Sequence, residues 1–174
     1  MPNSPLARYL YWDACVFIDF FDETPNRIAI IMDVMREVRE HSNSTIYTSI
    51  FTITEVNHLA VEQRRKKLSP DTLRILDNLW GDRNLITLIE FNRTIADLAR
   101  DLSRQALAFN WSLKPADAIQ LASAYWIKQR VKRPLDEIHT YDDRLYKFVP
   151  LVDIPICAPY ALQSSLPGIS QDNQ

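Results

Sequence analysis

Short apolar runs that each end at an acidic residue recur along this chain and limit the folds open to it. One run ends at Asp13 in LYWDACVFI, another at Glu55 in TSIFTITEV and a third at Asp142 in IHTYDDRL. Helical patterns separate the runs, and this alternation predicts a parallel sheet with helices on both faces. Ligands of such sheets bind at the carboxyl ends of the strands. We therefore expect these three acids at one sheet edge, joined by Asp117 from the helix start in LKPADAIQLASA.

The expected elements follow from apolar periodicity and from helix-start signals. Strands are predicted at 6–12, 45–51, 85–89, 137–140 and 151–154. Helices are predicted to start near Thr24, Thr52, Ser69, Thr94 and Lys114, with a short one over 142–148. Residues 1–154 are expected to form one domain. Residues 155–174 hold three prolines and end in QDNQ, so we expect an irregular tail with a disordered end.

Composition excludes several classes of protein. Two glycines, with no GxxxxGK[ST] and no GxGxxG, exclude P-loop and dinucleotide-binding proteins. Two cysteines exclude a disulfide scaffold or a Cys-rich zinc site and favour the reducing cytoplasm, and the three scattered histidines predict no zinc site. The sequence has no signal-peptide layout and no apolar stretch of about 18 residues, so no membrane association is expected. A net charge of −2 neither supports nor excludes an RNA substrate.

Three of the acids have an ordinary structural interpretation beside the functional one. Asp13 suits the N-cap of a helix, and Asp117 suits a first helical turn, where the helix dipole favours an acid. Glu55 fits a capping box with Thr52, which is the better interpretation of the local sequence. Carboxylates gathered at one edge, however, repel one another and need a counter-charge. Hard oxygen ligands suit Mg²⁺ or Mn²⁺, so the four acids together point to metal-dependent phosphodiester chemistry.

Polar residues around the last acid and one basic run add further candidates. Thr140 could orient a ligand or a water through its hydroxyl, and Asp143 could form a surface pair with Arg144 in place of a metal site. The basic run at 64–67, RRKK, closes a predicted helix, where positive charge suits the helix C-terminus. The same run could contact RNA phosphates.

Three other metal or phosphate chemistries fit the sequence poorly. Glu55 and His58 form E-x-x-H, but di-iron helix bundles need a second copy of this motif, and the chain has none. A haloacid-dehalogenase-like phosphatase needs a second aspartate two residues after the first, where this chain has Cys15. A phospho-receiver domain needs paired acids after the first strand, and these are missing as well.

In this order, the segments WDACVFIDFF, TSIFTITEV, PADAIQLASAYW and HTYDDRLYKF resemble a PIN domain, the fold of the VapC-type toxin ribonucleases. The resemblance covers residues 8–154 and implies a Rossmann-like three-layer α/β/α sandwich with a parallel sheet. It also implies a Mg²⁺- or Mn²⁺-dependent endoribonuclease with its acidic residues at Asp13, Glu55, Asp117 and Asp142. Members of the family commonly form homodimers, and the toxins are held inactive by a small antitoxin.

The chain departs from the family pattern in ways that bear on function. Cys15 stands where a small hydroxyl or amide residue is common, and sulfur is a poor ligand for hard metals, so it is left out of the metal set. The residues after 154 and the slightly acidic charge weaken the toxin assignment more than the fold. The alternative function is a catalytically weak PIN-like module that binds RNA or a protein.

Overall fold

The fold is built on one parallel sheet, seen in a computed structural model that describes residues 7–40 and 44–162. Its strands are β1 (Tyr9–Trp12), β2 (Thr45–Ser49), β3 (Ile86–Ile89), β4 (Glu137–His139) and β5 (Ile156–Cys157). They lie in the order β3-β2-β1-β4-β5, and every neighbouring pair is parallel. The chain builds outward from β1 to β3 and then returns to the other side of β1 with β4. The strand order therefore reverses between β1 and β4, the point where open α/β sheets bind ligands.

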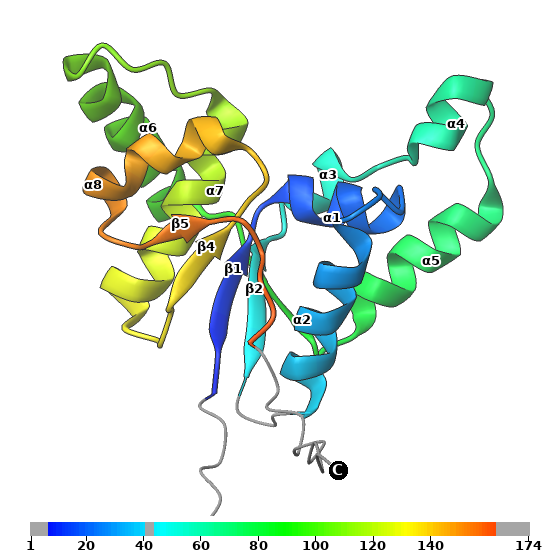
Figure 1. Ribbon diagram of the computed structural model, residues 1–174. Helices are drawn as coiled ribbons and strands as arrows, with labels where there is room; N and C mark the ends of the chain where they lie inside the picture. The colour runs from blue at the N-terminus through cyan, green and yellow to red at the C-terminus, as the bar shows by residue number, and fades with distance from the viewer. Residues whose placement is uncertain (1–6, 41–43, 163–174) are drawn as a thin grey trace, which may run out of the picture.

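Helices cover both faces of the sheet (Figure 1). One face carries α1 (Ala14–Phe21), α2 (Ile28–Glu40) and α5 (Pro70–Gly81). The other carries α6 (Arg93–Ala108), α7 (Pro115–Tyr125) and α8 (Val149–Val152). Short helices α3 (Thr52–Glu55) and α4 (Ala60–Arg65) link β2 to α5, a π-helical turn at Trp126–Val131 extends α7, and a 3₁₀ helix at Asp143–Phe148 leads into α8. No helix in these described ranges is long and apolar enough to cross a membrane.

Side-chain alternation along β1 divides the interior into two apolar cores. Leu10 and Trp12 pack with α1, α2 and α5, whereas Tyr11 packs with α6 and α7 on the opposite face. Successive side chains of a strand point to opposite faces, so a central strand must be apolar throughout. All three side chains are fully buried. The central strand is thus fixed from both sides, and the residue that follows it has a defined position.

The three-layer α/β/α sandwich with a parallel sheet is confirmed, but the last predicted strand is wrong. The segment 151–154 lies in α8 and the turn after it, where Asp153 adopts a left-handed conformation. The last strand is β5, inside the part of the chain that we expected to be irregular. The Pro155 carbonyl and the Cys157 carbonyl accept hydrogen bonds from Ile138 N and Thr140 N, which adds β5 to the sheet. The predicted disordered end, 163–174, lies outside the described residues.

Candidate functional site

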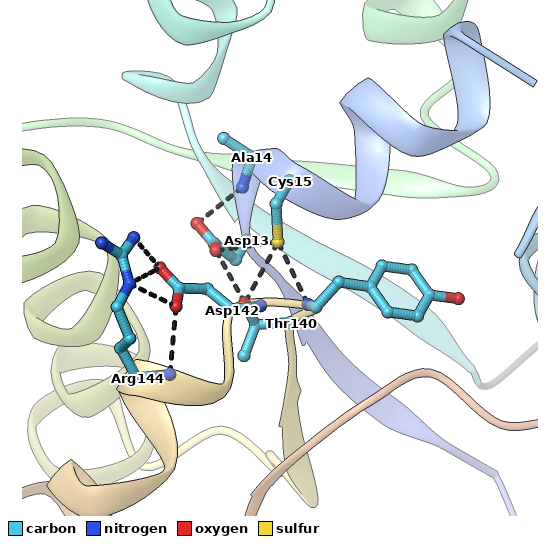
Figure 2. A network of polar contacts seen from close by, with 7 residues as sticks. Asp13, Ala14, Cys15, Thr140, Asp142 and Arg144 are labelled. Atoms are coloured by element: carbon cyan, nitrogen blue, oxygen red, sulfur yellow. Dashed lines mark hydrogen bonds and ion pairs between the residues drawn. The ribbon is translucent and has the colours of Figure 1, made fainter. Parts of the chain in front are cut away.

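Asp13 directly follows β1 and is held at the strand-order reversal by several hydrogen bonds (Figure 2). Its backbone N–H donates to the His139 carbonyl at 3.1 Å, which joins it to the end of β4. Its carboxylate accepts from the Ala14 N–H at 2.7 Å, from the Thr140 hydroxyl at 2.9 Å and from the Cys15 thiol at 3.1 Å. The side chain therefore caps α1 and also stands at the predicted edge.

The environment of Asp13 penalises its negative charge. Burial raises the pKa of this carboxyl, and the nearby charge of Asp142 raises it further, although the three hydrogen bonds act in the opposite direction. Burial likewise raises the pKa of Cys15 far above its usual range, so the residue stays a thiol that donates to Asp13. Cys15 remains outside the predicted metal set because its soft sulfur is a poor ligand for hard cations.

Glu55 ends α3, and the capping box predicted for it is wrong. No side chain caps α3. The Thr52 hydroxyl is buried instead, 2.8 Å from the Thr48 hydroxyl, and accepts a hydrogen bond from Gln120 Nε2 at 3.0 Å. The same Gln120 nitrogen donates to Glu55 Oε2. Contacts with α7 therefore override the local preference, and Glu55 is turned toward that helix.

Gln120 was missed in the sequence and fixes the position of Glu55. It lies on α7 three residues after Asp117, so the two side chains share a helix face. Its side chain is only 2% exposed. The Tyr11 hydroxyl donates to Gln120 Oε1 at 2.6 Å, which sets the orientation of the amide. A polar residue within the buried, small-residue run PADAIQLASA was the signal that could have found it.

Three carboxyls influence one another strongly enough to form one electrostatic group. Burial raises the pKa of Glu55 to about 7; the hydrogen bond from Gln120 opposes this shift, and the charges of Asp13 and Asp117 add to it. Burial also raises the pKa of half-buried Asp117, with the charges of Asp13 and Asp142 acting in the same direction. The fold thus gathers Asp13, Glu55 and Asp117 from β1, α3 and α7, which lie far apart in the sequence.

Asp142 belongs to the same edge but is neutralised by Arg144 (Figure 2). Its Oδ1 accepts from the Arg144 backbone N–H at 3.0 Å and from Arg144 Nε at 2.8 Å, and these bonds lower its pKa. The expected surface pair between Asp143 and Arg144 is wrong, because Arg144 pairs with Asp142. The Thr140 hydroxyl accepts from Asp142 N–H at 3.0 Å while it donates to Asp13, so Thr140 links the two aspartates.

The chemistry of the donor set fits a hard divalent cation, although the acids are spread out. All four predicted ligands are carboxylates, the donors that Mg²⁺ and Mn²⁺ prefer. Within the described residues, no three of them bring ligand atoms within 4.8 Å of one another. A cation would have to draw the carboxylates closer together.

The acids lie outside a cavity that the described part of the chain forms on one side of the sheet. That cavity, of about 760 Å³, lies between α1, α2 and α5 and is lined by Phe20, Met35 and Leu79 among others. None of the four acids lines it.

Comparison with solved structures agrees with the fold. A VapBC2 structure from Rickettsia felis bound to a DNA fragment from their promoter has a TM-score of 0.60 and 11% identity, covering 85% of this chain and 96% of that one. FitAcB from Neisseria gonorrhoeae has a TM-score of 0.58 and 15% identity, covering 88% and 99%. DNA-bound VapBC from Salmonella typhimurium has a TM-score of 0.57 and 12% identity, covering 87% and 97%.

Sequence comparison supplies the family. No curated protein matches the chain. The PIN domain family model matches residues 10–149, a range that contains all four acids and spans most of the sequence. The chain therefore belongs to the PIN domain family.

Proposed function

We propose that this protein is an endoribonuclease that hydrolyses RNA phosphodiester bonds with Mg²⁺ or Mn²⁺ bound by Asp13, Glu55, Asp117 and Asp142. One observation carries the proposal. The carboxyls of Asp13, Glu55 and Asp117 stand at the strand-order reversal, and each has a pKa raised by burial and by a neighbouring carboxylate. Acids that destabilise one another in this way are typical of functional sites. Membership of the PIN family also supports a metal-dependent nuclease.

Asp13 and Glu55 differ in how firmly hydrogen bonds hold their carboxylates. Asp13 is fixed by Ala14 and Thr140, so it offers a rigid ligand. Gln120 holds Oε2 of Glu55 and leaves Oε1 without a hydrogen bond from any described residue. Divalent metals in such sites lower the pKa of a bound water and neutralise charge on the phosphate. Without a metal, burial raises the pKa of Glu55 to about 7, and a bound cation would favour its charged, ligating form.

Exposed basic residues support RNA as the substrate class. The run 64–67 closes α4, and its Lys66 adopts the left-handed C-cap conformation, as the helix-end interpretation requires. All four side chains are nevertheless exposed, so they are free to contact phosphates as well. Lys114 lies close enough to Asp117 and Asp142 to lower the pKa of both. Positive charge of this kind binds nucleic-acid backbones without regard to base sequence.

We extend the proposal to the assembly and the setting of the protein. The similar structures are a VapBC2, a VapBC and a FitAcB, and the first two are bound to DNA. Their likeness supports a role as the toxin of a toxin–antitoxin pair, with an antitoxin protein as partner and a homodimer as the working form. Both cysteines are free, as a reducing cytoplasm would keep them.

The test is cleavage of labelled single-stranded RNA by wild-type protein and by Asp13→Asn, each with Mn²⁺, Mg²⁺ or EDTA. Asparagine still caps a helix, so α1 should survive the substitution. We expect cutting that needs a divalent metal and is lost in the variant. Equal cutting by the two proteins would reveal a contaminating ribonuclease and leave the proposal without support.

The bond between Asp142 and Arg144 favours one second candidate, a catalytically weak PIN-like module that binds RNA or a protein. An arginine on a metal ligand competes with the cation for that carboxylate. Calorimetric titration with Mn²⁺ separates the two functions. No binding at millimolar Mn²⁺, together with RNA binding and no cleavage, would establish the module.

A further inference from the structure

A second group of metal-ligating side chains lies on β4 and β5, away from the four acids. Glu137 and His139 are two residues apart on β4 and so point to the same face of the sheet. Cys157 on β5 is the parallel partner of His139. Glu137 Oε2 lies 3.0 Å from His139 Nε2 and 3.8 Å from Cys157 Sγ, and one ligand atom from each residue falls within 4.8 Å of the other two.

We propose that Glu137, His139 and Cys157 form a zinc-binding site. Imidazole, thiolate and carboxylate are the three ligand types of protein zinc sites. With zinc–ligand bonds of about 2.0–2.3 Å, the ligand atoms of a tetrahedral site stand about 3.3–3.8 Å apart. The Glu137–Cys157 distance of 3.8 Å lies at the upper end of that range and the Glu137–His139 distance of 3.0 Å lies slightly below it, so the strand register brings the ligand atoms close to zinc-binding spacing.

The donor set differs from that of the four acids. A thiolate is a soft ligand that selects zinc over Mg²⁺ or Mn²⁺, whereas four carboxylates select the hard cations. The His139 side chain is fully buried, and its Nδ1 has no hydrogen-bond partner within the described residues. Metal binding at Nε2 places the imidazole proton on Nδ1 and the Cys157 thiol proton in solvent. The only histidine hydrogen bond given up is the one to Glu137.

Neighbouring charges are compatible with a divalent cation. Arg8 NH2 lies 3.6 Å from Glu137 Oε2, but Arg8 NH1 also donates to Glu37 Oε2 at 3.0 Å. The carboxylate of Glu137 and the thiolate of Cys157 supply two negative charges, which balance the charge of a zinc ion. Charge balance of this kind offsets the cost of desolvating an ion.

Tyr160 contacts Glu137 and Arg8, so zinc binding would also stabilise the segment that contains Tyr160. Its hydroxyl donates to Glu137 Oε1 at 2.6 Å, and its ring lies 4.7 Å from the Arg8 guanidinium carbon. Three protein ligands leave the fourth zinc position to water, and the partly exposed Cys157 provides access. Because β5 has only two residues, a metal shared with β4 would hold this strand and the Tyr160 segment on the sheet.

The experiment uses the full chain without an affinity tag, stripped with chelator and titrated with Co²⁺ as a spectroscopic substitute for zinc. A cobalt–thiolate bond gives a charge-transfer absorption that carboxylate sites lack. We expect this band in wild type, its loss in Cys157→Ser and its retention in Cys15→Ser, the matched control for the other cysteine. Asp13→Asn should keep the band, because the four acids form a separate site. If the proposed metal site at the acids were wrong, cobalt binding at Glu137, His139 and Cys157 would be unaffected.

A second readout does not depend on cobalt. Zinc that binds only the folded state raises the unfolding temperature. Wild type and Cys15→Ser should gain from equimolar zinc, and Cys157→Ser and Glu137→Gln should not, with metal-free unfolding curves verifying that each variant folds. Absence of the cobalt band in wild type would overturn the site. So would a band that survives Cys157→Ser and disappears in Cys15→Ser, because the metal would then lie beside Asp13.

Discussion

Two aspartates that follow neighbouring strands, Asp13 after β1 and Asp142 after β4, lie in opposite electrostatic environments. Asp13 is buried, receives hydrogen bonds only from uncharged groups, and has a raised pKa. Asp142 is held by an arginine and has a lowered pKa. The Thr140 hydroxyl contacts both residues. An acid can thus be placed at a site in two ways, with its charge left unbalanced for a cation or balanced in advance by the protein.

The comparison predicts that replacing Asp13 with asparagine lowers the rate of RNA cleavage more than the same replacement of Asp142. Asp13→Asn should lower RNA cleavage by about 100-fold or more, because even residues that only support metal ligands contribute about 10–100-fold. Asp142→Asn should cost less, since Arg144 already competes for that carboxylate. Initial cleavage rates at saturating Mn²⁺ measure both effects.

Asp143→Asn is the matched control for these two variants. Asp143 is an exposed acid beside Asp142, and the structure gives it no part in the site. It should keep the wild-type rate. A larger loss in Asp142→Asn than in Asp13→Asn would reverse the comparison and make Asp142 the principal ligand.

Gln120 extends the comparison to Glu55, whose charge is supported by a neutral amide. Gln120→Met keeps the size of the side chain but removes the hydrogen bond that lowers the pKa of Glu55. We expect Mn²⁺ affinity to fall about 10-fold or more and the pKa of Glu55 to rise above its wild-type value of about 7. Calorimetry measures the affinity, and NMR titration of the Glu55 carboxyl measures the pKa.

The loss of Gln120 also affects stability, so the folded fraction must be determined. The Gln120 amide forms hydrogen bonds with Tyr11, Thr52 and Glu55. Each buried polar group left without a hydrogen bond costs about 1–3 kcal/mol of stability. A folded Gln120→Met protein with unchanged Mn²⁺ affinity would show that the amide stabilises the core without positioning Glu55.

The gathering of the acids could be predicted from sequence, whereas their partners could not. Strand ends of a parallel sheet meet at one edge, so acids at the ends of apolar runs had to converge. The role of Arg144 depends on which side of the 3₁₀ helix faces the acids, and no local pattern fixes that, whereas the only sign of Gln120 was its polarity within the small-residue run PADAIQLASA. Thr52 shows the reverse failure, because its capping-box pattern was clear and tertiary contact with Gln120 overrode it.

The end of the sheet was misjudged for a similar reason. The predicted strand 151–154 overlaps the run VPLV (149–152), which is apolar and short, so its pattern fits a strand or a helix equally well. Its proline falls in the first turn of α8, where the missing N–H costs nothing. The pairing of Cys157 with His139 links segments that no sequence period relates, which is why the histidines looked scattered.

A smaller effect is expected when the balanced aspartate is released. Arg144→Gln leaves Asp142 free to bind a cation, and its pKa should return toward the ordinary value. Mn²⁺ affinity should rise by about fivefold at most, because exposed ion pairs are worth about 1 kcal/mol or less. Arg100→Gln, which breaks an exposed pair with Asp101, is the matched control and should leave Mn²⁺ binding unchanged. Weaker binding in Arg144→Gln would mean that Arg144 supports the site instead of competing with it.

A pH dependence of stability separates the unbalanced acids from the rest of the protein. The pKa of Glu55 is raised from 4.5 to about 7, so in metal-free protein its favourable contribution is complete below pH 4.5 and is lost as the pH rises to about 7. Buried His139 has a lowered pKa and opposes this trend, because its contribution to stability grows as the pH rises through the same range.

The informative quantity is therefore the difference in unfolding free energy between wild type and Glu55→Gln. Between pH 7 and pH 4.5 the wild type should gain unfolding free energy relative to the variant, measured by urea denaturation in EDTA. A saturating concentration of Mn²⁺ at pH 7 should remove most of this difference, because the cation would balance the negative charge of Glu55. If the pH profiles of the two proteins in EDTA were parallel, the neighbours of Glu55 would not be raising its pKa.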